Sequence, residues 1–179
     1  MMKKLIPALI IGMGLSAGAF AAPLPDGTIT INGALTATTC TINGNGSGSK
    51  DFTVTLPTVS TALLTGAGSS TGVTGFTIAL TACTADVPVH TFFNYGANVQ
   101  PDGALKNALG TAANVEVQLL NKNLAVLDLT KADGVQGDVS TAISSGVATM
   151  QYAAQYYSPL GGAGAGSVAT SVTYNISYQ

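Results

Sequence analysis

The sequence ends on a stretch that alternates almost without a break, Gly166-Ser-Val-Ala-Thr-Ser-Val-Thr-Tyr-Asn-Ile-Ser-Tyr-Gln179. Its large apolar residues share one parity: Val168, Val172, Tyr174, Ile176 and Tyr178. Alternation at period two predicts a β-strand with one buried face. Proteins usually protect an open sheet edge with proline or charged residues. This stretch contains neither. We therefore expect another strand to cover this edge.

Near the start of the mature chain lies a second stretch whose apolar residues alternate, Thr28-Ile-Thr-Ile-Asn-Gly-Ala-Leu35. One of its faces consists of Ile29, Ile31, Gly33 and Leu35. A chain with a spare first strand and an open last edge can polymerise head to tail, if each copy inserts its first strand beside the last strand of a neighbour. Alternatively, the two ends pair within one molecule and close a sandwich. These two stretches alone favour neither arrangement over the other.

Residues 1–21 have the anatomy of a secretory signal peptide. Lys3 and Lys4 precede an apolar run, and Ala19-Phe-Ala21 fits the small-x-small cleavage rule. A transmembrane anchor is the alternative, but the run is short and no basic stop-transfer cluster follows it. We therefore expect an exported mature protein of 158 residues, a length that suits one domain.

The mature chain is poor in charge. Four lysines stand against eight acids, which gives a net charge of −4, and there is no arginine. Nucleic acids and anionic membrane surfaces bind clustered cations, so we expect neither as a partner. Only 8% of the residues are charged, against about 25% in ordinary soluble domains. The weak self-repulsion favours close packing of many copies.

Cys40 and Cys83 are the two cysteines of the chain. In an exported protein, two cysteines most often form one disulfide. It would close a loop of about 43 residues and stabilise the fold by about 4 kcal/mol. A metal site needs more ligands than these cysteines and the lone histidine, His90, supply. A Ser-His-Asp arrangement would also have to use His90, so we expect no metal, no cofactor and no enzyme activity.

The middle of the chain predicts an all-β fold. Short alternating runs indicate strands at residues 52–56, 73–80, 87–95, 114–120, 124–129 and 147–157. Glycine-, asparagine- and serine-rich or polar loops are expected at residues 43–49, 65–72, 131–140 and 159–166. Residues 102–109 could form at most one or two helical turns. Short strands at near-regular spacing, with such turns between them, describe a β-sandwich.

Taken together, these residues resemble the type 1 pilin family of chaperone–usher fimbrial subunits along the whole mature length. The resemblance rests on Leu35 lying five residues before Cys40, and on the penultimate Tyr178 with Gly166 fourteenth from the end. It also rests on segments at residues 56–57, 72–80, 113–119 and 150–157. The fold that it implies is an incomplete immunoglobulin-like β-sandwich, completed by a donor strand from another subunit.

The resemblance also implies an organisation of the chain and a set of partners. Residues 22–38 would form an N-terminal donor-strand extension and residues 39–179 the pilin domain. The donor residues would be Ile29, Ile31, Gly33 and Leu35. The acceptor groove and chaperone-recognition strand would include Gly166, Val172, Tyr174, Ile176 and Tyr178. The implied partners are other copies of the chain, related pilus subunits, a periplasmic chaperone and an outer-membrane usher.

The implied role is a structural subunit, exported through the periplasm to fimbriae on the cell surface, where the fibre serves adhesion. The length leaves no room for a separate receptor-binding domain. A chain with both a donor and an acceptor end fits a shaft or adaptor position, and we favour the major shaft subunit. The alternative is a closed, monomeric exported sandwich that binds a glycan or small ligand.

Overall fold

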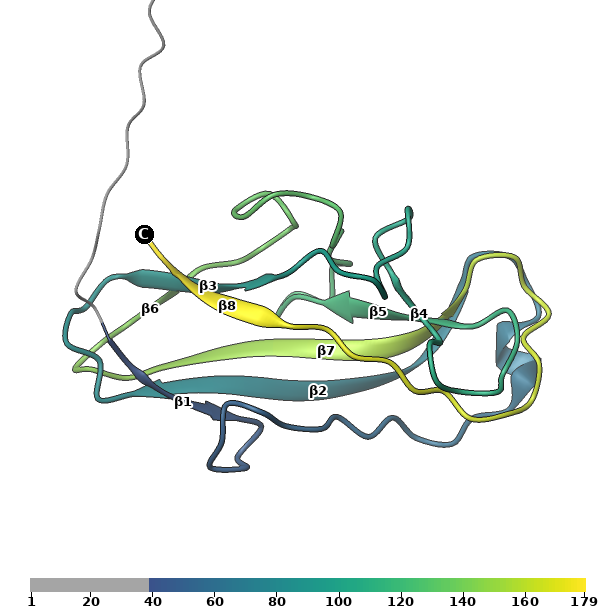
Figure 1. Cartoon of the computed structure of the whole chain (residues 1–179), viewed down its shortest axis with the longest axis horizontal. Helices are drawn as coiled ribbons and strands as arrows, with labels where there is room; N and C mark the ends of the chain where they lie inside the picture. The colour runs from purple at the N-terminus through teal and green to yellow at the C-terminus, as the bar shows by residue number, and fades with distance from the viewer. Residues whose placement is uncertain (1–38) are drawn as a thin grey trace, which may run out of the picture. The chain divides into compact units, whose positions relative to one another are not determined.

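The computed structural model describes residues 39–179. The expected signal peptide and the expected donor residues Ile29, Ile31, Gly33 and Leu35 lie outside the described residues. Within residues 39–179, two antiparallel β-sheets face each other (Figure 1). The helical element of this part is the 3-10 helix η1 (Thr61–Leu64). No helix among the described residues is long and apolar enough to cross a membrane.

The larger sheet has the strand order β1-β2-β7-β5-β4 and the smaller sheet the order β6-β3-β8. The strands of the larger sheet are β1 (Thr41–Gly44), β2 (Ser69–Thr81), β7 (Ala148–Ser158), β5 (Glu116–Leu120) and β4 (Leu105–Lys106). Those of the smaller sheet are β6 (Thr141–Ala142), β3 (Pro88–Phe93) and β8 (Tyr174–Tyr178). The all-β prediction is confirmed. β8, the end of the chain, is an edge strand of the smaller sheet within the described residues.

The core lies between the two sheets and is filled by residues of one parity from each strand. On the central pair, the inward residues Phe76, Ile78, Leu80, Met150, Tyr152 and Ala154 are all buried. A chain of aromatic contacts crosses the core, with ring centroids 5.3–6.2 Å apart, in the order Tyr174, Phe52, Phe76, Tyr152 and Phe93. Such pairs stabilise a fold by about 0.5–1.5 kcal/mol each beyond their buried area.

The disulfide expected from the cysteine count is present between Cys40 and Cys83. It joins the residue just before β1 to the residue that follows shortly after β2. Nearby, the Thr84 N–H donates to the Thr39 carbonyl at 3.1 Å, and the Cys83 N–H donates to the Gly146 carbonyl at 3.0 Å. The first described residues are therefore fixed to the end of β2.

Three expected strands differ from the structure. The ladder at the end of the chain covers only β8, so residues 166–173 are not a strand. Residues 52–56 pair with no strand in the described part, although their side-chain burial alternates. Residues 124–129 form only one bridge, between Leu120 and Val126. A ladder needs a neighbouring backbone, whereas an alternating pattern needs only one buried face.

Smaller elements were missed or displaced. β1 ends inside the expected loop 43–49, because Asn43 and Gly44 still pair with β2 and the turn begins only at Asn45. β2 starts at Ser69, within the expected loop 65–72. The expected helical turns at residues 102–109 are replaced by the two-residue strand β4 and its flanking turns. η1, β4 and β6 are too short to leave a periodic pattern in the sequence.

Candidate functional site

A groove of about 810 Å³ opens between two segments that lie far apart in the sequence. One wall is residues 50–56 and the other is residues 168–174. Both segments run along the sandwich between its two ends (Figure 1). The floor of the groove is made of core residues from both sheets: Phe76, Phe93, Leu105, Val117, Leu119 and Ala154. The groove therefore reaches down to the apolar core.

The first wall is an extended segment without a partner. Phe52, Val54 and Leu56 are half-buried in the groove, while Asp51 and the threonines between them are exposed. Within the described residues, no hydrogen bond joins the backbone of residues 52–59 to another segment. Backbone N–H and C=O groups that are taken out of water need partners. This wall therefore carries the side-chain pattern of a strand but lacks the ladder.

The second wall is paired on one side only, as the register of β8 shows. The Asn94 N–H donates to the Thr173 carbonyl, and the Gln179 N–H donates to the Pro88 carbonyl, both at 2.9 Å. In an antiparallel ladder, residues bonded to one neighbour alternate with residues whose backbone groups point the opposite way. The backbone groups of Tyr174, Ile176 and Tyr178 therefore point away from β3. No described strand pairs with that side of β8.

The same alternation continues before β8, where loops replace β3 as the partner. The Ala169 carbonyl accepts from the Leu109 N–H at 3.0 Å, and the Ser171 carbonyl accepts from the Asn98 side-chain amide at 2.9 Å. The backbone groups of Val168, Thr170 and Val172 therefore face the groove. The Thr170 hydroxyl oxygen is also buried and has no partner in the described residues. This wall offers both unpaired backbone and apolar side chains.

One contact bridges the two walls. The Tyr174 hydroxyl donates to the Lys50 carbonyl at 2.6 Å. The Tyr174 ring also lies edge-on to Phe52, with centroids 6.2 Å apart. Burial, with a contribution from the charge of Asp51, raises the pKa of Tyr174 above its usual value. The phenol therefore stays protonated at neutral pH and remains a hydrogen-bond donor.

The structure brings together only some of the predicted acceptor residues. Val172 and Tyr174 line the groove. Ile176 and Tyr178 continue the same face and pack against the core, but they do not line the cavity. Gly166 lies outside it and packs against another loop, where a Cβ would come within 2.5 Å of the Ala112 nitrogen.

The sequence did not reveal the opposite wall as part of the site. The alternation of Phe52, Val54 and Leu56 gave the signal for a strand. It could not indicate that this strand would lack a neighbour, because pairing depends on segments that are distant in sequence.

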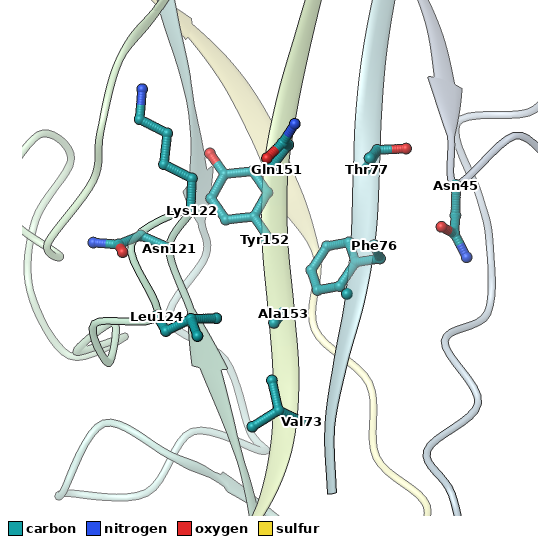
Figure 2. Close-up of a pocket in the computed structure, with 11 residues that line it drawn as sticks. Asn45, Val73, Phe76, Thr77, Asn121, Lys122, Leu124, Gln151, Tyr152 and Ala153 are labelled. Atoms are coloured by element: carbon teal, nitrogen blue, oxygen red, sulfur yellow. The ribbon is translucent and has the colours of Figure 1, made fainter.

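A second hollow, of about 340 Å³, lies on the outer face of the larger sheet. Figure 2 shows Lys122, Asn121 and Leu124 on one side of it and Asn45 on the other. Thr77 and Gln151 line it from the parity opposite to that of the core residues. No acid and no histidine lines this hollow.

The contacts of His90 hold parts of the fold together. Its Nε2 lies 2.6 Å from Asp133 Oδ1, and the Ser177 hydroxyl donates to Asp133 Oδ2 at 2.8 Å. Burial would raise the pKa of Asp133, but the hydrogen bonds from Ser177 and His90 and the charge of His90 lower it below its usual value. The contacts tie the loop at residues 131–140 to β3 and β8. The described residues contain no cluster of three or more metal-ligating side chains.

Comparison with known sequences gives the family of the chain. Residues 56–179 match the family model for the FimA type-1 fimbrial protein. The major fimbrial subunit SMF-1 of Stenotrophomonas maltophilia is 41% identical over 172 residues, which cover 92% of this chain and 99% of that protein. The F17 fimbrial protein of Escherichia coli is 37% identical over 178 residues, covering 95% and 97% of the two chains.

Solved structures agree on the fold. The P pilus rod subunit PapA superposes with a TM-score of 0.60 at 18% identity, covering 78% of this chain and 99% of that one. A subunit of a chaperone–usher pilus gives a TM-score of 0.57 at 20% identity, covering 89% and 100%. The fold is an incomplete immunoglobulin-like β-sandwich, as expected. On the sequence match and the fold together, the chain belongs to the type-1 fimbrial protein family.

Proposed function

We propose that this chain is a non-enzymatic structural subunit of a chaperone–usher fimbria and polymerises by donor-strand exchange. The observation that carries the proposal is the groove, because both of its walls leave backbone groups unpaired on the side that faces it. An added strand would pair with these groups and cover the half-buried apolar side chains on the two walls. This is recognition by strand addition.

The N-terminal extension has the side chains that such a strand needs. Ile29, Ile31 and Leu35 alternate with small, mostly polar residues, so one face would enter the groove and the other would meet solvent. Burying three large aliphatic side chains contributes about 5–9 kcal/mol in total before entropic costs. Gly33 would let the strand approach a wall where a side chain does not fit.

The proposed position in the fibre is the shaft rather than an adaptor. The relatives that match nearly the full length include one named as a major fimbrial subunit. The low charge of the chain also suits a position in which many copies pack together. Before assembly, a periplasmic chaperone would occupy the groove and hold the C-terminal strand. An outer-membrane usher would then exchange the chaperone for the next subunit, and the fibre would stand on the cell surface.

The substitution Ile31→Asp tests this proposal, because it places a carboxylate on the donor face. We expect the variant to be exported and to bind a donor peptide in its own groove, but not to add to the fibre. Thr30→Asp is the matched control, since it places the same charge on the opposite parity. Electron microscopy of surface fibres distinguishes the two variants. Normal fibres from Ile31→Asp would refute donor-strand assembly through this segment.

A further inference from the structure

Three strongly exposed leucines lie on loops at one end of the sandwich, where the groove also ends. The exposed fractions of Leu63, Leu109 and Leu160 are 56%, 84% and 77%. Two backbone hydrogen bonds of 3.2 Å, Gly162 to Thr65 and Ala163 to Leu64, join the loop of Leu160 to η1. The Leu109 N–H bonds to Ala169, at the start of the second groove wall. We call residues 60–68, 107–113 and 158–166 the leucine end.

The composition of the leucine end is unusual for a surface. Its three segments contain no charged residue, and apart from the leucines they are mostly glycine, alanine, serine and threonine. Single exposed leucines are normal on soluble proteins. Several of them on adjacent uncharged loops form an apolar surface of the kind that marks an interface.

The opposite end of the sandwich is polar. There the Ser140 hydroxyl donates to the side chain of Gln179 at 2.9 Å. Asp133, which is bonded to His90 and Ser177, adds a carboxylate close to that end. Asp86 accepts from the backbone N–H groups of Ser145 and Gly146 in the turn before β7. Charged residues are depleted at the centre of protein interfaces, so of the two ends the leucine end is the better contact surface.

We propose that the leucine end is covered by the body of a second copy of this chain, the copy whose N-terminal extension fills the groove. This inference rests on the proposed donor-strand function. Only residues 36–39 separate Leu35 from Cys40, and Cys40 is bonded to Cys83 in its own body. A fully extended chain from residue 35 to residue 40 spans at most about 18 Å. The body of the donor copy therefore lies directly against the end of the groove from which its extension leaves, and of the two ends the uncharged, apolar leucine end is the one suited to that contact.

The contact would strengthen the attachment between the two subunits beyond what the donor strand alone provides. The groove residues bind the extension, whereas the leucine end would bind the folded domain that follows it. Leu63, Leu109 and Leu160 do not line the groove, so the two contributions can be separated by substitution. The leucine end would then set how firmly, and at what angle, successive subunits stack.

The test compares two double variants of the full chain assembled into fibres. The first is Leu109→Ser with Leu160→Ser. The matched control is Leu124→Ser with Val126→Ser, whose exposed fractions are 62% and 49% and which lie on a different loop. Both are assayed for the affinity of a peptide of residues 24–37 for the single subunit. Both fibres are then assayed for their rate of dissociation in guanidinium chloride.

We expect unchanged peptide affinity in both variants, and fibres of the leucine-end variant that dissociate on the order of tenfold faster or more. A dissociation rate equal to that of the control would overturn the inference. So would lower yield of the single subunit with no change in fibre dissociation, since that would assign the leucines to a different partner. Absence of peptide binding in the unsubstituted subunit would instead overturn the donor-strand function itself.

A labelling measurement covers the case in which the double variant fails to fold. A cysteine introduced as Leu109→Cys is expected to react with a maleimide in the single subunit and to be protected in the fibre. Equal reactivity in both forms would contradict coverage of the leucine end.

Discussion

Tyr174 and Lys50 join the two walls of the groove by one hydrogen bond of 2.6 Å, although they are 124 positions apart in the sequence. The bond runs from a side chain of β8 to the backbone of the unpaired wall, beside the edge-on contact between Tyr174 and Phe52. No backbone ladder joins the two walls among residues 39–179. The walls of the isolated subunit are therefore held together by side chains rather than by a sheet.

Substitution of this tyrosine tests the contribution of the bridge. Tyr174→Phe keeps the ring and removes the hydroxyl, so we expect the isolated subunit to lose about 1 kcal/mol of unfolding free energy. Denaturant unfolding at neutral pH measures the change. Tyr95→Phe is the control, because Tyr95 is exposed and the same atom is removed. Equal stability of the two variants would show that the bridge contributes nothing.

The close approach at Gly166 predicts a second effect. Alanine at this position would bring its Cβ within 2.5 Å of the Ala112 nitrogen and 2.6 Å of the Thr111 hydroxyl oxygen. Because backbone must move to relieve this overlap, we expect Gly166→Ala to cost about 1–3 kcal/mol of unfolding free energy. Gly164→Ala serves as the control, since its nearest contact is an ordinary 3.4 Å. If both variants unfold at the same denaturant concentration, the close approach is not a constraint.

Glu116 predicts a dependence of stability on pH. Burial, then the charge of Asp102 and a hydrogen bond with that carboxyl, raise the pKa of Glu116 from 4.5 to about 7. The folded state therefore binds a proton more tightly than the unfolded state does. The stability that this group contributes is complete below pH 4.5 and is lost as the pH rises through 7.

Glu116→Gln removes this titration. We expect the variant to gain about 1 kcal/mol relative to the unsubstituted chain between pH 4.5 and pH 8, a discounted figure because the carboxyl is partly exposed to solvent. Urea unfolding across this pH range measures the difference. Asp102→Asn should reproduce part of the effect by removing the neighbouring charge. Parallel pH profiles for the variant and the unsubstituted chain would contradict the raised pKa.

Much of the fold could be predicted from local patterns. The alternation of Val168, Val172, Tyr174 and Ile176 predicted which side chains are half-buried, and the structure agrees. The number of cysteines predicted the disulfide between Cys40 and Cys83. Both features depend on the chemistry of the residues themselves, and a single sequence displays that chemistry directly.

Pairing and long-range contacts could not be predicted in the same way. Phe52, Val54 and Leu56 alternate as a strand does, but only the arrangement of the other strands leaves them without a partner. The bond between His90 and Asp133 joins residues 43 positions apart, inside what the sequence indicates only as a polar loop. Such contacts depend on the whole topology, which local periodicity does not determine.

The most direct test of the incomplete fold is thermal unfolding of residues 38–179, measured with and without a peptide of residues 24–37. If the groove awaits a strand, the domain alone unfolds at a low temperature, and the peptide raises the midpoint by on the order of 20 °C. A peptide with aspartate in place of Ile31 should raise it far less. A domain that is already stable, and whose midpoint does not respond to the peptide, would mean that the sandwich is closed without a donor strand.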